Sequence, residues 1–210
     1  MQRLVSVKLS AGLVEGMLEV PDGARKVVLF AHGSGSSRFS SRNNYVAGEL
    51  RKAGIGTLLM DLLTPDEEAD YPVRFDIPLL TDRLGLACDL LRTEPATLSL
   101  PIGLFGASTG AAAALQLAAL RLGDIAAVVS RGGRPDLAGR DALAKVTAPT
   151  LLIVGGNDHE VITFNQQAFS ALQCEKRIDI IPGATHLFEE PGTLEKVALL
   201  AQQWFSDRKH

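Results

Sequence analysis

A serine between two glycines stands where an apolar run gives way to an alanine-rich segment. The pentapeptide GASTG, residues 106–110, matches the pattern G-x-S-x-G, in which a strand turns sharply into a helix with the serine at its apex. The preceding LPIGLFG is typical of a buried strand, and the following AAAALQLAALRL favours a helix. A serine here could merely cap the helix. We interpret Ser108 as a nucleophile, and a hydroxyl nucleophile needs a base.

A histidine and a carboxylate follow two later apolar runs. His186 lies in IPGATHLFEEPG, after the last predicted strand, and Asp158 directly follows TLLIVGGN. Both are therefore expected on loops at the carboxyl edge of a parallel sheet, where Ser108 also emerges. There His186 would accept the serine proton while Asp158 orients its ring. The neighbouring His159 is expected to be solvated.

Two backbone N–H groups are predicted to stabilise the oxyanion of acyl transfer. Thr109 follows the nucleophile at the start of a helix, where the helix dipole is positive. The second donor is expected in FAHGSGSSR, from Ser34 or, less favourably, Gly35, which is also a candidate substrate contact. His32 in the same segment is interpreted as a buried residue that shapes the loop, and His210, the last residue, is expected to be disordered.

Two arginines flank a pair of glycines in SRGGRPDLAG, after the apolar run IAAVVS. One alternative is that Arg131 and Arg134 are solvated or pair with Asp136. The other follows from their place at the active-site edge, because a guanidinium matches a carboxylate. We hypothesise that Arg131 or Arg134 faces the substrate cleft and that the preferred esters or lactones carry an anionic group.

The elements that must position these residues alternate along the chain. LVSVKL and LVEGMLEV predict an antiparallel hairpin at one sheet edge, and six later apolar runs predict parallel strands with helices on both faces. The fold class is therefore α/β. The acidic, proline-containing segment TPDEEADYPVRFD is expected to be a mobile loop. The expected helices span residues 42–53, 78–93, 108–121, 137–146, 160–172 and 192–207.

Composition narrows the partners. The 210 residues carry a net charge of −3, so we expect neither nucleic acid nor a membrane surface as a partner. Cys88 and Cys174 lack the spacing of a metal site and are expected to be buried thiols. The first ten residues, MQRLVSVKLS, show no secretory leader pattern. We expect one cytoplasmic domain over residues 1–210 that needs no metal or cofactor, with its oligomeric state left open.

The chain resembles the α/β-hydrolase superfamily, within it the small dienelactone-hydrolase-like branch, whose members include hydrolase domains sometimes joined to phosphoribosyltransferases. The resemblance rests on HGSGSSR, LLMDLLTP, GLFGASTGAAAAL, SRGGRPDLA, PTLLIVGGNDHEV and PGATHLFEEPG, with triad residues in the chain order Ser, Asp, His. It implies a mainly parallel central sheet and serine hydrolysis. The connection between IAAVVS and PTLLIVGG is too short for a cap domain, so a shallow, open site is expected.

One departure from the family bears on the substrate. Dienelactone hydrolases use a cysteine nucleophile where this chain has Ser108. The serine favours hydrolysis of small carboxylic esters or lactones generally, through an acyl-enzyme. Leaving-group preference depends on pocket shape, so a peptidase or thioesterase of the same fold stays open. The non-catalytic alternative is a ligand receptor that keeps the hydrolase fold but does not turn over a substrate.

Overall fold

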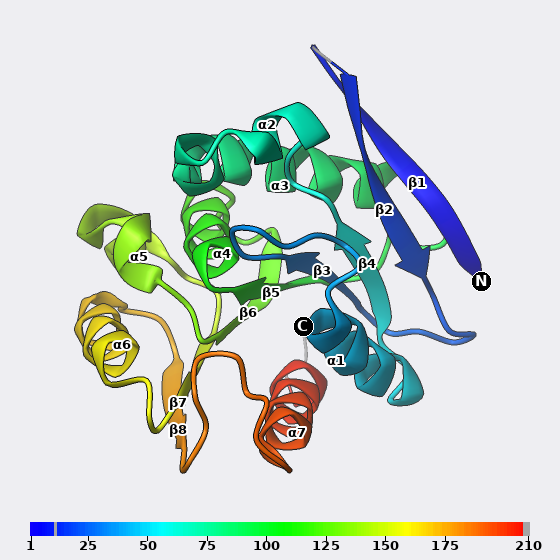
Figure 1. Ribbon diagram of the computed structural model, residues 1–210. Helices are drawn as coiled ribbons and strands as arrows, with labels where there is room; N and C mark the ends of the chain where they lie inside the picture. Colours follow the sequence, from blue (N-terminus) through cyan, green and yellow to red (C-terminus); the bar gives the residue numbers. More distant parts are fainter. Residues whose placement is uncertain (11, 208–210) are drawn as a thin grey trace.

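The computed structural model describes residues 1–10 and 12–207 and contains an eight-stranded mixed sheet in the order β1-β2-β4-β3-β5-β6-β7-β8 (Figure 1). The strands are β1 (Gln2–Leu9), β2 (Gly12–Glu19), β3 (Val27–Ala31), β4 (Gly56–Met60), β5 (Ile102–Ala107), β6 (Ile125–Arg131), β7 (Thr150–Gly155) and β8 (Lys176–Ile181). The α-helices are α1 (Ser41–Lys52), α2 (Pro65–Ala69), α3 (Ile77–Thr93), α4 (Thr109–Leu120), α5 (Arg140–Lys145), α6 (His159–Ala171) and α7 (Thr193–Ser206), and the 3-10 helices are η1 (Pro72–Phe75) and η2 (Pro135–Ala138).

The sheet is antiparallel at its N-terminal edge and parallel elsewhere. β1 and β2 form the predicted hairpin, and β2 continues antiparallel to β4. Each later neighbour pair from β4–β3 to β7–β8 is parallel. The predicted mainly parallel α/β-hydrolase sheet with an N-terminal hairpin is therefore confirmed. Ala11, in the predicted turn, and His210 lie outside the described residues.

Two apolar layers explain why the central strands read as continuous apolar runs. In β3, Val27, Leu29 and Ala31 pack into one layer. Val28 and Phe30 pack into the other. Alternate side chains leave opposite faces of a strand, so a strand covered on both faces has no polar side. Helices α1 and α7 cover one face of the sheet, and helices α3 to α6 cover the other (Figure 1).

The segment predicted as a mobile loop instead forms α2 and η1, so that prediction was wrong. Thr64 and Glu67 form a reciprocal capping box, and Pro65 stands at the first helical position. Glu67 also pairs with Arg83 of α3 at 2.6 Å. The acidic residues that suggested a loop are thus the cap and anchor of a short helix.

The parallel strands bring their carboxyl ends to one edge of the sheet, and the loops that leave this edge carry the predicted site residues. The structure describes all of residues 132–149, and between β6 and β7 they form only η2 and α5. The expected absence of a cap domain in this connection is confirmed.

Candidate active site

Ser108 occupies a sharp turn between β5 and α4. Its backbone has φ 50° and ψ −120°, a conformation that residues other than glycine rarely adopt. The flanking glycines are required by close backbone contacts. A Cβ at Gly106 would lie 2.4 Å from the Cα of Ala111, and a Cβ at Gly110 would lie 2.3 Å from the carbonyl oxygen of Ala31. Ser108 makes no side-chain capping bond to α4, which argues against the helix-cap alternative.

The loop after β6 holds this turn in place. The Ser108 N–H donates to the carbonyl of Arg131 at 3.4 Å, and the Arg134 N–H donates to the carbonyl of Ser108 at 3.0 Å. The Arg131–Arg134 segment is therefore bonded directly to the backbone of the strained serine. These hydrogen bonds help to hold the backbone of Ser108 in a conformation that is unfavourable on its own.

His186 and Asp158 meet as the sequence predicts. His186 Nδ1 lies 2.7 Å from Asp158 Oδ2, and the histidine side chain is 40% exposed while the carboxylate is 15% exposed. The carboxylate thus fixes the ring from behind and leaves Nε2 as the nitrogen for proton transfer. Two other carboxylates near this edge are engaged elsewhere, Asp61 with Arg38 and Glu189 with Arg42.

A cavity of about 190 Å³ joins the serine to the histidine. It is lined by Gly33, Ser34, Ser36, Ser40, Arg42, Asn43, Ala107, Ser108, Arg131, Gly132, His186 and Leu187. Pockets that hold drug-sized ligands are usually larger, about 300–1,000 Å³, so this one suits a small group. Its lining is rich in polar residues and includes four serines and two arginines.

The predicted oxyanion donors have partners that the sequence did not suggest. The Ser34 N–H donates to the side-chain Oγ1 of Thr109 at 2.9 Å, and the Gly35 N–H donates to Glu68 of α2 at 3.0 Å. Ser34 lines the cavity, whereas Gly35 does not. Thr109 begins α4, so its N–H has no acceptor within the helix. His32 is buried as predicted, and its Nε2 accepts the Leu62 N–H at 3.0 Å.

Arg131, the last residue of β6, and Arg134, three residues later, have opposite environments. Arg131 is only 6% exposed and lines the cavity, where its Nη2 donates to Asn43 at 3.0 Å. Arg134 forms a two-bond pair with Asp136, lies over the ring of Phe164 and does not line that cavity. Arg131 therefore lines the same cavity as Ser108, whereas Arg134 pairs with Asp136, which was the alternative to a place in the substrate cleft.

Sequence reasoning missed the wall contributed by the start of α1. Ser40 caps this helix, and Arg42 and Asn43 follow in its first turn. The signal was present in SSRFSSRNN, a polar run after a strand that also contains a helix cap, but neither residue type nor spacing shows which way its side chains point.

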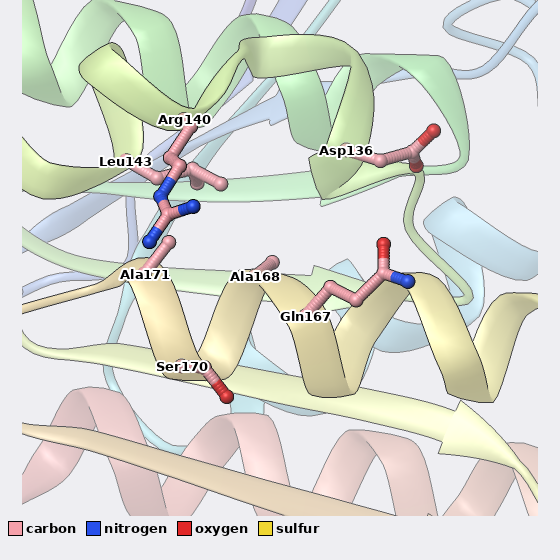
Figure 2. Close-up of a pocket in the computed structure, with 7 residues that line it drawn as sticks. All are labelled: Asp136, Arg140, Leu143, Gln167, Ala168, Ser170 and Ala171. Atoms are coloured by element: carbon pink, nitrogen blue, oxygen red, sulfur yellow. The ribbon is translucent and has the colours of Figure 1, made fainter.

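Other features of the described residues lie away from this edge of the sheet. A separate cavity of about 430 Å³ lies between α5 and α6 and is lined by no triad residue (Figure 2). Burial raises the pKa of the Cys88 thiol to about 12, and Cys174 is half-buried rather than buried as expected. Within residues 1–10 and 12–207, no cluster of three metal-ligating side chains occurs. Nor does any helix in that part of the chain have the length and apolarity to cross a bilayer.

Comparisons with known proteins agree on the fold. A model of the "Dienelactone hydrolase family" matches residues 16–205. A dienelactone hydrolase structure from Anabaena variabilis is 54% identical, with a TM-score of 0.95 over 100% of this chain and 99% of that one. The structure of Est1E from Butyrivibrio proteoclasticus, 15% identical with a TM-score of 0.80 over 97% of this chain and 98% of that one, shows a likeness of fold alone.

A curated relative from Mycobacterium tuberculosis is named "Putative phosphoribosyl transferase". It is 58% identical over 194 residues, which are 92% of this chain but 44% of the relative. The chain therefore spans less than half the length of this relative.

Proposed function

The chain belongs to the dienelactone hydrolase family, and on that premise we propose that it is a serine hydrolase that cleaves small carboxylic esters or lactones through an acyl-enzyme on Ser108. The observation that carries the proposal is the 2.7 Å contact of His186 Nδ1 with Asp158, beside a cavity that both His186 and Ser108 line. Nucleophile, base and orienting carboxylate then follow the roles of a Ser-His-Asp triad.

The steps need only these side chains and water. Ser108 Oγ attacks the carbonyl carbon as its proton passes to His186 Nε2, and the same proton then leaves on the alcohol of the ester. Water attacks the acyl-enzyme, giving a proton to His186, and the acid is released as Ser108 recovers its proton. Asp158 stays ionised and holds the ring in the required tautomer.

The oxyanion that forms during attack needs two donors. The Thr109 N–H is one, at the positive end of α4. The Ser34 N–H is proposed as the second, which requires it to exchange the Thr109 hydroxyl for the oxyanion. Gly35 is no longer proposed in this role, because Glu68 holds its N–H away from the cavity.

The size of the cavity and the missing cap favour small or projecting acyl groups over long buried chains. We propose further that the transferase activity in the name of the longer relative resides in the part that this chain does not match. Arg134 is no longer proposed as a substrate contact, because Asp136 already occupies its guanidinium.

The test is hydrolysis of p-nitrophenyl esters, simple lactones, thioesters and aminoacyl anilides by the wild type and Ser108→Ala. Cleavage of esters or lactones that depends on Ser108 supports the proposal. Cleavage of thioesters or anilides that is faster than cleavage of esters would favour a thioesterase or a peptidase. No cleavage of any of these compounds would favour the non-catalytic receptor.

A further inference from the structure

Arg131 is a buried cation without a carboxylate partner in the described part of the chain. Its contacts are the Asn43 amide oxygen at 3.0 Å and the face of the Phe188 ring at 5.9 Å. Its Nε is buried and makes no hydrogen bond. Burial, and then repulsion from Arg42, lower the pKa of Arg131 to about 10, which still leaves it charged at neutral pH. A buried charge in this position is costly unless an anion compensates it.

A second guanidinium lines the same cavity. Arg42 bonds through Nη1 to Glu189 at 3.1 Å, but that carboxylate is largely exposed, and the Arg42 Nε is buried without a partner. The Arg42–Glu189 pair therefore neutralises the rim of the cavity and leaves Arg131 uncompensated inside it. Two guanidinium groups held around one small space offer more donors than a single carboxylate can accept.

The start of α1 adds to the same positive potential. Ser40 caps the helix by accepting the Asn43 N–H, and Ser40, Arg42 and Asn43 all line the cavity. First-turn N–H groups and the helix dipole favour phosphate at such a position. Ser34 and Ser36 also line the cavity. These features, added to the buried Arg131, fit a dianion with several acceptor oxygens.

We infer that the ester substrate carries a phosphate group, which Arg131 and Arg42 hold at the α1 wall of the cavity while Ser108 attacks the ester carbonyl. The phosphate serves for recognition and takes no part in bond making, so the bonds made and broken are those of the acyl transfer described above. This inference rests on the proposed function, because it names the substrate class of the same site.

Binding is tested apart from turnover by melting each protein in a buffer free of phosphate, with inorganic phosphate added in steps. The matched control is Arg134→Gln, three residues from Arg131. The melting temperatures of the wild type and of this control are expected to rise by about 4 °C when phosphate reaches about ten times its dissociation constant. The melting temperature of Arg131→Gln should rise by no more than about 1 °C. That of Arg131→Lys, which keeps the charge but not the paired donors of a guanidinium, should rise by an intermediate amount. Chloride and succinate at the same ionic strength separate this effect from that of salt.

Turnover is tested with p-nitrophenyl esters whose acyl chains have equal length and end in a methyl, a carboxylate or a phosphonate. The ratio of kcat/KM for the phosphonate over the methyl ester should fall about tenfold in Arg131→Gln and less in Arg42→Gln, and stay constant in Arg134→Gln.

Equal phosphate stabilisation of wild type and Arg131→Gln would overturn the inference, even if esters are cleaved. Stabilisation by succinate equal to that by phosphate, or equal ratios for carboxylate and phosphonate esters, would overturn the assignment to phosphate. Phosphate binding that depends on Arg131, without cleavage of any ester, would support the subsite and overturn the proposed hydrolase function.

Discussion

Leu104 and Phe105 of β5 are fully buried, one in each apolar layer, whereas Ser108 stands just past the end of the same strand in a strained backbone conformation. The same change occurs along β6, where buried Val128 and Val129 are followed by the uncompensated charge of Arg131. Within a few residues the chain passes from packing that stabilises the fold to groups that cost stability.

This difference separates two kinds of residue by what their replacement should change. Side chains in the apolar layers contribute burial, so their loss lowers the free energy of unfolding. The groups that we propose for catalysis and binding at the carboxyl edge are held in costly conformations or environments, so their loss is expected to lower activity and to leave stability equal or higher. The variants below test this division.

Replacement of the nucleophile should give the largest effect. Ser108→Ala is expected to lower kcat/KM for a p-nitrophenyl ester by ~10⁴- to 10⁶-fold, because the triad acts as a unit. His186→Ala should lose about as much, and the double variant little more. Urea unfolding should show Ser108→Ala within about 0.5 kcal/mol of wild type. A large loss of stability would place Ser108 among the structural residues.

Asp158→Asn comes next, with an expected loss of roughly 10⁴-fold in kcat from the wrong histidine tautomer. Asp61→Asn is the control, because Asp61 pairs with Arg38 rather than with His186. Steady-state kinetics on one ester compares the two variants. Retention of more than about a tenth of the activity by Asp158→Asn would mean that another carboxylate orients the ring, against the roughly 10⁴-fold loss expected of the triad.

Phe105→Ala tests the other side of the division. Phe105 is fully buried and its ring centroid lies 4.8 Å from that of Phe30. Its loss should lower the free energy of unfolding by about 3–5 kcal/mol in urea titrations. The Phe105→Ala protein that remains folded should still be labelled at Ser108 by an active-site reagent. A loss below about 1 kcal/mol would contradict the importance of this layer.

Arg131→Met should give the smallest effect and one of opposite sign. Burial lowers the pKa of Arg131, so its charged form costs stability at neutral pH, and an apolar side chain removes that cost. We expect the free energy of unfolding to rise by about 1–2 kcal/mol in phosphate-free buffer, since Asn43 loses a partner in exchange. A decrease would show that Arg131 is a structural residue.

Sequence predicted the sheet, most helices and the placement of Ser108, Asp158 and His186 at one edge of the sheet, because each depends on local pattern and on the order of elements along the chain. It failed where tertiary contacts decide. Arg131 and Arg134 are only three positions apart, at the end of β6 and in the loop that follows, and the positions of Asp136 and of the cavity distinguish them. The 64–76 segment reads as a loop by composition, but its cap and its pairing with Arg83 make it helical.

The oxyanion loop shows the same limit. FAHGSGSSR is expected to hold the second oxyanion donor, and this segment does approach the serine: a Cβ at Gly33 would lie 2.9 Å from the Cβ of Ser108. The hydrogen bond of the Ser34 N–H to the Thr109 side chain joins residues 75 positions apart, so no local pattern could reveal it.

Labelling with a fluorophosphonate, followed by peptide mass spectrometry, tests the central claim most directly, because only a serine activated by a positioned base reacts quickly. We expect one adduct, on Ser108, in folded wild type, with little labelling in His186→Ala and none on that peptide in Ser108→Ala. Absence of the adduct in folded wild type, or equal labelling of His186→Ala, would contradict the assignment of Ser108 as a triad nucleophile.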